Sequence, residues 1–424
     1  MAGDISFTAA GGANSIGTSC YYFKFGATTV AVDYGGGFGK QLEPDDLGRP
    51  DWLLVTHAHF DHAGMVPRAL LKWPQVRILA TRETVELADW VWEDAIRVSQ
   101  RLKRPAPYTE RDISAVNRRI KRCLPGEQFT IGRNLTVRVL SAGHILGAAS
   151  FLFTYGDRTV FVTGDISLRR RGLIGAADEL SLGHCDLLVR ESTYVGLHPE
   201  NTYEEQTEAL AARVFKIVGD GGQVVIPTLS IDRMQEVALA LHRRGVQHLA
   251  DLYLVGGESP TSTYVRNLPD AFALTDVPRL ESIAQQQHIM RYRKPAVIIA
   301  SSGMVMPGTP SYSWVTSVLE RPDCAVLFVN WQNPTTPGGA LLKSQHGEWV
   351  VMPDNRYRRR CLVERFDLSS HMKEDEAHLL EQRLHPATVI HVHGEDQRIQ
   401  TFLDARAGIG PQRIKSKVGR EVII

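Results

Sequence analysis

The stretch WLLVTHAHFDHAG at residues 52–64 decides what kind of protein this chain forms. Its apolar start, Trp52–Val55, predicts a buried strand. Three histidines and one aspartate follow within six positions, namely His57, His59, Asp61 and His62. Imidazole nitrogens and carboxylate oxygens are ligands that a divalent ion such as Zn²⁺ accepts. In an extended stretch the first three of these side chains point the same way and His62 points elsewhere, so the spacing predicts two metal ions beyond the strand.

The alternative for this stretch is a solvated loop that happens to contain histidine. The chain has 15 histidines among 424 residues, so three of them within six positions directly after a strand is improbable by chance. The motif therefore indicates a metallohydrolase. By itself it does not say which reaction that hydrolase catalyses.

The composition is that of an ordinary globular protein, with 43% hydrophobic and 22% charged residues. The length suits two domains, or one domain with a large insertion. We see no secretory signal and no apolar stretch that could span a membrane. Five scattered cysteines without a Cys-x-x-Cys pair predict reduced thiols and a cytoplasmic location. With a net charge of +1, any nucleic-acid site must be a local patch.

Further metal-type side chains follow other predicted strands in the same way. His144 comes after a strand at 135–140, Asp165 after one at 159–163, and His393 after one at 388–392. A lone histidine or aspartate there is more often structural, but the shared placement favours a common metal site. Asp33, at the end of a strand at 28–33, either holds a metal-ligating histidine in place or only ends its strand, and the sequence leaves the two even.

The pattern changes after residue 198. Alternating helical and short apolar segments there predict a parallel α/β layer, and metal-type residues resume near residue 366. The simplest organisation is a metal-binding α/β domain that is interrupted and then resumed. Helical spacing also predicts helices over residues 63–72, 83–102 and 110–123. Most basic side chains between residues 97 and 122 are expected on solvated helix faces.

Together these motifs resemble those of the metallo-β-lactamase superfamily and, within it, the β-CASP nucleases. Residues 56–64, SAGHILGA at 141–148 and VTGDIS at 162–167 resemble the superfamily's metal motifs. ESTY at 191–194, SSH at 369–371 and VHGE at 392–395 resemble the three motifs that distinguish the β-CASP group. The resemblance implies an α/β fold: a metallo-β-lactamase αββα sandwich interrupted by an inserted α/β β-CASP domain. Its implied parts are the first metallo-β-lactamase part at 1–197, the β-CASP domain at 198–365, and the C-terminal return at 366–424.

The same resemblance implies that seven ligands share two zinc ions. The implied ligands are His57, His59 and His144 for one ion, Asp61, His62 and His393 for the other, and Asp165 between the two. These ligands also accept Mn²⁺ or Fe²⁺. Paired ions lower the pKa of a shared water and stabilise charge on a phosphoryl oxygen, so Asp61 is expected to be needed for catalysis.

The resemblance further implies a general acid. In-line attack at phosphorus expels the 3′-oxygen of the preceding nucleotide and leaves 5′-phosphate and 3′-hydroxyl ends. The leaving oxygen needs a proton, which metal-bound histidines lack. His371, at the family's acid position, would supply it, while Glu191 would hold its imidazole and favour the charged form. The alternative for His371 is a buried histidine with its hydrogen bonds satisfied.

Substrate preference is implied less directly. RNA-acting members resemble this chain in having histidine where His393 stands, which favours RNA over DNA. The RNA is expected to be single-stranded. The inserted domain departs from the family in LSIDR at 229–233, where Asp232 replaces glycine, and in VNWQ at 329–332, which casts doubt on substrate details. The candidate substrate contacts are Ser301, Ser302, Arg233, Arg169, Arg170 and Arg358. The basic runs at 169–171 and 356–360 either contact phosphates or are only solvated, and the sequence leaves the two even.

The leading hypothesis is a zinc-dependent ribonuclease with endonuclease action, with or without 5′-exonuclease action. A β-CASP DNA nuclease is the nearest alternative. A small-ester hydrolase of the same superfamily would not need the inserted domain, and a non-catalytic RNA-binding subunit would not need all seven ligands. A homodimer is compatible with the sequence, although no motif predicts one.

Overall fold

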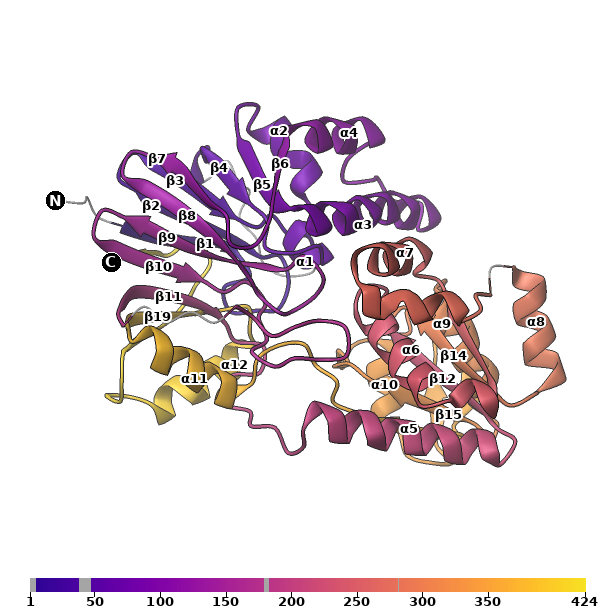
Figure 1. Ribbon diagram of the computed structural model, residues 1–424. Coiled ribbons are helices and arrows are strands. Elements are labelled where there is room, and N and C mark those ends of the chain that lie inside the picture. The colour runs from indigo at the N-terminus through magenta and orange to yellow at the C-terminus, as the bar shows by residue number, and fades with distance from the viewer. Residues whose placement is uncertain (1–4, 38–46, 179–182, 281) are drawn as a thin grey trace. The chain divides into compact units, whose positions relative to one another are not determined.

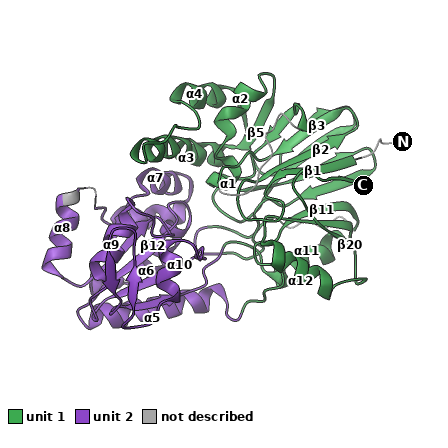
Figure 2. Cartoon of the chain, turned by 180° about the vertical axis from the view of Figure 1, so that it is seen from behind, with its two compact units in different colours: residues 1–170, 174–199, 370–424 green, residues 171–173, 200–369 purple. Residues whose placement is uncertain are grey.

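The chain folds into two compact units in the computed structural model, which describes residues 5–37, 47–178, 183–280 and 282–424. Unit 1 contains residues 1–170, 174–199 and 370–424, and unit 2 contains residues 171–173 and 200–369 (Figure 2). The predicted boundary at 197/198 lies two residues from the division at 199/200, and the one at 365/366 lies four from 369/370. The short segment 171–173, which belongs to unit 2, was not predicted.

Unit 1 is built on two seven-stranded sheets that face each other (Figure 1). The first has the order β21-β1-β2-β3-β4-β5-β6 and the second the order β20-β19-β11-β10-β9-β8-β7. The strands of the first sheet are β1 (Ile5–Gly11), β2 (Cys20–Phe25), β3 (Thr28–Val32), β4 (Trp52–Leu54), β5 (Arg77–Thr81), β6 (Ile120–Cys123) and β21 (Glu421–Ile423). Those of the second are β7 (Gln128–Gly132), β8 (Leu135–Ser141), β9 (Ala149–Tyr155), β10 (Arg158–Val162), β11 (Cys185–Glu191), β19 (Pro386–Val392) and β20 (Gln412–Lys415).

The inner faces of both sheets form one apolar core. Phe23 of β2 and Phe153 of β9 are fully buried, with ring centres 5.9 Å apart. Phe25 lies 5.3 Å from Phe153 and 6.1 Å from Phe23, which links the two sheets through aromatic contacts. Burying such a side chain stabilises the fold by roughly 1.5–3 kcal/mol. This core fixes how the two sheets are aligned, and therefore which strand ends meet.

Helices cover the outer faces, as the αββα expectation requires (Figure 1). Beside the first sheet lie α1 (Phe60–Ala63), η2 (Val66–Arg68), α2 (Ala69–Lys72), α3 (Arg82–Arg101) and α4 (Glu110–Arg119). Beside the second lie α11 (Glu374–Leu384) and α12 (Asp396–Ala405). Thr109 and Asp112 form a capping box that begins α4, each accepting a backbone N–H that the first turn leaves unpaired.

Two predicted helices were wrong in extent. The helix expected over 63–72 is broken into short pieces around Pro67, which lacks the N–H that a continuous helix needs. The helix expected over 110–123 ends at Arg119, and residues 120–123 form β6, paired in parallel with β5. Ile120 and Cys123 are buried in this strand. A tertiary partner strand therefore overrides the local helical pattern.

Unit 2 contains the predicted parallel sheet, with the order β13-β14-β12-β15-β18. Its strands are β12 (Gln223–Thr228), β13 (Asp251–Val255), β14 (Ala296–Ser301), β15 (Ala325–Phe328) and β18 (Leu362–Arg365), with a separate hairpin of β16 (Trp349–Val351) and β17 (Arg356–Arg358). Its helices are α5 (Tyr203–Gly219), α6 (Arg233–Arg243), η3 (Val246–His248), α7 (Glu258–Asn267), η4 (Pro269–Asp276), α8 (Ile283–Tyr292), α9 (Pro310–Val318) and α10 (Pro337–Lys343).

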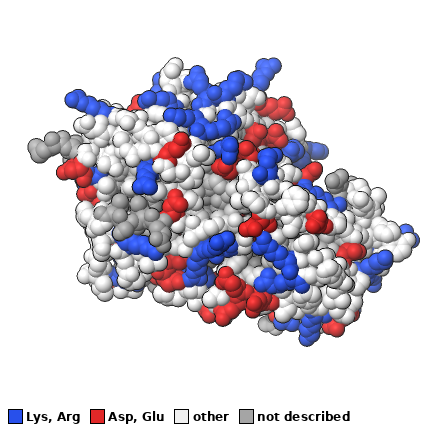
Figure 3. All heavy atoms as spheres, in the orientation of Figure 1, with Lys and Arg blue, Asp and Glu red and all other residues white. Residues whose placement is uncertain are grey.

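On the face that Figure 3 shows, basic and acidic side chains are mixed. Lys and Arg side chains gather where α2 and α4 lie in unit 1 (Figure 3). The basic side chains of α4, Arg111, Arg118 and Arg119, are exposed to solvent, as predicted for this helix. Among the helices that the structure describes, none is long and apolar enough to cross a membrane.

Candidate metal centre

The carboxyl ends of four strands meet at one edge of the second sheet of unit 1. Strands β10, β11 and β19 run parallel, and β8 runs in the same direction because both β8 and β10 are antiparallel to β9. The residues that follow or end these strands are His144 for β8, Asp165 for β10, Glu191 for β11 and His393 for β19. The sandwich brings His57, after β4, to the same place, with His57 Nε2 3.5 Å from Asp165 Oδ2.

The His-rich stretch is extended only as far as His59. His59 is the residue before α1, and Asp61 and His62 lie in the helix itself, so the predicted extended path through Asp61 was wrong. The turn is held from the neighbouring loop, where the N–H of Ser19 donates to the Asp61 carbonyl at 2.8 Å. Gly35 packs so closely that a Cβ there would lie 1.8 Å from the same carbonyl oxygen. The helical turn separates Asp61 and His62 by about 100° around the helix axis.

Hydrogen bonds on the outer nitrogens fix the tautomers of two histidines. The Thr56 hydroxyl donates to Asp33 Oδ2 at 2.8 Å, so it accepts from the His57 Nδ1–H at 3.0 Å. His144 Nδ1 lies 3.0 Å from the carbonyl oxygen of Ser370, which can only accept. Both rings therefore carry their proton on Nδ1, and the lone pair of each Nε2 points into the site.

Three imidazoles converge on one point. His59 Nδ1 lies 3.1 Å from His57 Nε2 and 3.2 Å from His144 Nε2. Burial lowers the pKa of all three histidines, so they are neutral near pH 7. Two lone pairs therefore face a third ring nitrogen, with the Asp165 carboxylate 3.6 Å from His144 Nε2. This donor set, three neutral nitrogens and one carboxylate, fits a divalent cation.

A second group of possible ligands adjoins the first and comprises Asp61, His62 and His393. His393 Nε2 lies 3.2 Å from Asp61 Oδ2, and His62 Nε2 lies 3.3 Å from Asp165 Oδ2. Although burial alone would lower the pKa of His62, the carboxylates of Asp165, Asp61 and Asp33 raise it well above its usual value. This excess of negative charge around one ring would equally suit a second cation. The residues present therefore fit the metal content that the superfamily implies.

Two residues in this region have a strained backbone conformation. Asp33 has φ of 64° and His393 has φ of 51°, in the left-handed region that non-glycine residues rarely adopt. Such a conformation costs about 1–3 kcal/mol and persists where surrounding contacts fix it. For Asp33, the contact is a 2.7 Å bond between its Oδ2 and His62 Nδ1. Asp33 therefore holds His62 from behind, which is one of the two roles that the sequence left open.

His371 and Glu191 form a hydrogen-bonded pair beside the metal-type residues. His371 Nδ1 lies 2.9 Å from Glu191 Oε2, and the other oxygen of Glu191 accepts the N–H of Ile166 at 2.9 Å. Burial alone would lower the pKa of His371, but the carboxylates of Glu191 and then Asp165 raise it to about 9. The His371 side chain keeps 22% of its surface exposed. A protonated imidazole is therefore held in place and can still reach solvent.

Sequence reasoning missed three groups that position the ligands. Thr56 and the Ser370 carbonyl fix the rings of His57 and His144, as described above. The Thr193 hydroxyl donates to the His393 carbonyl at 3.2 Å and lies 3.2 Å from His393 Nδ1. Thr56 and Thr193 lie inside the quoted motifs and could have been suspected there. The Ser370 contribution is a backbone atom, which no side-chain pattern reveals.

Two of the predicted substrate contacts have carboxylate partners within their own unit. Arg169 pairs with Asp375 and, at 3.1 Å, with Glu376, both at the start of α11. Arg233 is buried, with its Nη2 2.7 Å from Asp232 Oδ2. Substrate binding by these two arginines stays a prediction, and each arginine also forms an ion pair within its unit. Arg170 and Arg358 are exposed.

The carboxyl edge of the unit 2 sheet holds Ser301 at the end of β14 and Ser302 next to it. Buried polar side-chain atoms without a hydrogen-bond partner among the described residues lie at the last residue of β12 and on the loops after β14 and β15: Thr228 Oγ1, Ser302 Oγ, Asn330 Oδ1 and Gln332 Oε1. Unsatisfied buried polar groups are costly, and ligands often bind at the carboxyl ends of parallel strands. This edge is therefore where unit 2 offers polar contacts to a ligand.

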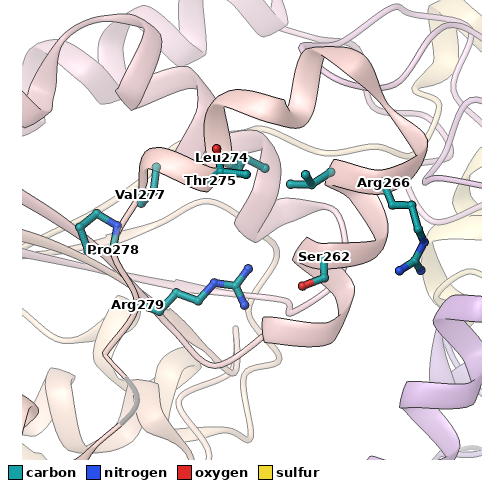
Figure 4. A pocket seen from close by; sticks show the side chains of 8 residues that line it. Ser262, Arg266, Leu274, Thr275, Val277, Pro278 and Arg279 are labelled. Atoms are coloured by element: carbon teal, nitrogen blue, oxygen red, sulfur yellow. The ribbon is translucent and has the colours of Figure 1, made fainter.

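A separate hollow of about 430 Å³ lies elsewhere in unit 2, between α7 and the segment around η4 (Figure 4). Ser262, Arg266, Thr275 and Arg279 supply its polar lining, and Arg279 points toward Ser262 across it. No residue that the sequence analysis selected lines this hollow.

Comparison with known proteins agrees with this architecture. Residues 16–212 match the metallo-beta-lactamase superfamily, and residues 233–341 match the Beta-Casp domain. "Probable RNase MJ4" of Methanocaldococcus jannaschii is 24% identical over 98% of this chain and 99% of its own length. "Endoribonuclease YSH1" of Gibberella zeae is 30% identical over 58% of this chain and 30% of its own length. A solved protein of unknown function from Enterococcus faecalis V583 shares the fold, with a TM-score of 0.63 and 12% identity over the full length of both chains. The chain belongs to the metallo-β-lactamase superfamily and carries its β-CASP domain.

Proposed function

We propose that this protein is a zinc-dependent ribonuclease that cuts single-stranded RNA internally and leaves 5′-phosphate and 3′-hydroxyl ends. The observation that carries the proposal is the position of His371, whose Nδ1 lies 2.9 Å from Glu191 Oε2, beside a cluster of other histidines and carboxylates. A hydrolase needs both an activated water and a proton donor for its leaving group. The described residues of unit 1 offer donor sets for the first and an imidazolium for the second.

The proposed ligands are those implied by the family resemblance. His57, His59 and His144 would hold one zinc ion, Asp61, His62 and His393 a second, and Asp165 would contact both. Asp165 Oδ2 lies 3.3–3.6 Å from ring nitrogens of His57, His62 and His144, which come from both proposed ligand sets, and this supports the assignment. Mn²⁺ and Fe²⁺ would be accepted by the same donors. Two divalent ions bound there supply an activated water and offset the charge on phosphoryl oxygens.

The chain's own residues then direct the proton. His371 bonds Glu191 through Nδ1, so its Nε2–H is the proton that can reach a leaving oxygen. Glu191 is fixed at the same time by the N–H of Ile166, which prevents its carboxylate from turning away. Asp33 and Thr56 orient His62 and His57 through Nδ1, and so leave Nε2 of each ring free to hold a cation.

RNA is favoured as the substrate by the relatives. Both curated relatives described above carry ribonuclease names, and one of them matches nearly the whole chain. Histidine at position 393, within the proposed metal group, accords with the RNA-acting pattern in the family resemblance. At the carboxyl edge of the unit 2 sheet, the unsatisfied hydroxyls of Thr228 and Ser302 can donate to a phosphate, and the amide oxygens of Asn330 and Gln332 can accept from a ribose hydroxyl.

The test uses two end-labelled oligonucleotides, RNA and DNA of one sequence. We expect wild type to cut the RNA at internal positions, and Asp61→Ala and His371→Ala to cut it at least a hundredfold more slowly. His371→Ala should keep two zinc ions per chain by elemental analysis, whereas Asp61→Ala should lose metal. His378→Ala, which removes an exposed histidine of α11, is the matched control and should cut like wild type.

The same experiment separates the alternatives. Equal rates on RNA and DNA would remove the preference for RNA. Cleavage of neither strand by a protein with two ions bound would indicate a small-ester hydrolase. Loss of zinc in His371→Ala would make His371 a ligand and refute its assignment as the acid.

A further inference from the structure

The hairpin of β16 and β17 in unit 2 has two unlike faces. Its register pairs Trp349 with Arg358 and Val351 with Arg356, and side chains alternate along each strand, so these four lie on one face. All four are exposed, with Trp349 57% and Val351 69% accessible. On the other face Val350 is buried in the unit 2 core, and Tyr357 packs against the same core. The core holds the hairpin by one face and leaves the other outward.

The outward face combines an aromatic ring with two cations. The Arg356 guanidinium lies 5.7 Å from the centre of the Trp349 ring, within cation–π range. Arg358 donates through Nε to the Gly347 carbonyl at 3.2 Å, which steadies its guanidinium. Half-buried sheets usually alternate apolar residues inward with polar residues outward. The exposed Trp349 and Val351 depart from that rule, and together with the two arginines they indicate a binding surface.

Carboxylates near the hairpin accept hydrogen bonds from neighbouring groups, and Glu320 accepts the N–H of Arg358 itself at 2.9 Å. Asp354 accepts hydrogen bonds from the hydroxyls of Tyr312 and Tyr357, which lower the pKa of this carboxyl. Glu348 accepts the N–H of Gln345 at 2.7 Å. Along the outward positions of the two strands there are two arginines and no acid. The face therefore presents positive charge around an exposed ring.

We propose that this outward face is a binding platform for single-stranded RNA, with Trp349 stacked on a base and Arg356 and Arg358 contacting flanking phosphates. The identity of the polymer rests on the proposed function. Base stacking on an aromatic ring combined with basic groups along the backbone is how single strands are bound without sequence readout. The overall charge of +1 gives no general attraction for RNA, so binding must come from such local surfaces.

The test measures RNA affinity as a function of salt, in the Asp61→Ala background so that the RNA stays intact. Trp349→Ala should raise the dissociation constant about fivefold or more, because one stacked base is lost, and should leave the salt slope unchanged. Arg356→Gln/Arg358→Gln should lower the slope of log K against log salt by about 1.4, since each lost phosphate contact on a single strand contributes about 0.7. Trp349→Phe, which keeps a ring, should bind nearly as the parent does.

The controls remove similar groups elsewhere in unit 2. Tyr292→Ala deletes an aromatic ring that is 61% exposed, and Arg243→Gln/Arg244→Gln neutralises two exposed arginines of α6 and the residue after it. Both controls should keep the affinity and the salt slope of the parent. All of the altered side chains are exposed, so the fold should not change.

If Trp349→Ala bound RNA as tightly as the parent, or if the double arginine variant kept the parent's slope of log K against log salt, the proposed RNA-binding platform would be refuted. Unchanged RNA affinity together with a Trp349→Ala-dependent change in sedimentation mass would refute it too, because the face would then be a protein interface. The proposed function fails separately. If the protein never cut RNA but Trp349→Ala still weakened RNA binding, the ribonuclease would be refuted and the platform supported.

Discussion

Replacing Glu191 by glutamine should move the alkaline limit of cleavage to lower pH. The bond from His371 Nδ1 to Glu191 Oε2 is 2.9 Å, and the Glu191 carboxylate is the largest of the charges that raise the pKa of His371 to about 9. An acid must be protonated to work, so activity is full below this pKa and falls as pH rises through it. Glutamine keeps the shape of the side chain but removes the charge, so the limit should shift toward the ordinary value of about 6.5.

The expected loss of activity in Glu191→Gln follows from these two pKa values. At pH 8, a group with pKa about 9 is roughly 90% protonated, and one with pKa about 6.5 is roughly 3% protonated, so Glu191→Gln should lose as much as about thirtyfold in activity at pH 8. Much less is lost at pH 6, where both forms are protonated. Cations bound at Asp165 would offset the second charge that raises the His371 pKa, so both limits should lie somewhat below these values. The direction of the difference remains the same.

The assay is kcat/KM for RNA cleavage between pH 5.5 and 10, for wild type, Glu191→Gln and Glu191→Asp. Zinc content is measured at each end of the range, so that loss of metal is not mistaken for loss of the acid. Glu191→Asp retains the charge and should shift the alkaline limit less than glutamine does. An alkaline limit that does not move in Glu191→Gln, at wild-type metal content, would refute the assignment of His371 as the acid.

Three other predictions concern the metal centre and the stability of each unit. Asp33→Asn should weaken metal binding about 10- to 100-fold in chelator competition, because Asp33 Oδ2 accepts from His62 Nδ1 at 2.7 Å; unchanged affinity would contradict this positioning role. Phe153→Ala should lower the free energy of unfolding by about 3–5 kcal/mol in urea, since this fully buried ring joins the two sheets, whereas a loss under 1 kcal/mol would contradict its place in the core. Asp232→Gly should relieve the backbone strain of a residue with φ of 72°. It should still lower the free energy of unfolding by about 2 kcal/mol or more in the same assay, because buried Arg171 and Arg233 lose a carboxylate partner. A gain in stability would show that backbone strain outweighs these ion pairs.

Much of the architecture could be predicted from local pattern. Apolar runs ending in metal-type residues placed β4, β8, β10 and β19, and alternating segments after residue 198 predicted the parallel sheet of unit 2. Local pattern failed where a distant partner decided the outcome. Residues 120–123 have helical spacing but pair with β5, and Asp61 lies in a helical turn fixed by the N–H of Ser19.

The sequence alone determined the inventory of metal-type donors, the strand ends that carry them, and the family. Only the tertiary structure decided what each donor does. His144 takes its tautomer from a carbonyl 226 residues away, and His371 takes its charge from a carboxylate 180 residues away. The outward face of Trp349 and Arg356 likewise exists only because the register of β16 and β17 puts them on one side. Protonation, tautomer and exposure depend on which atoms surround a group, and a linear chain does not specify those neighbours until it has folded.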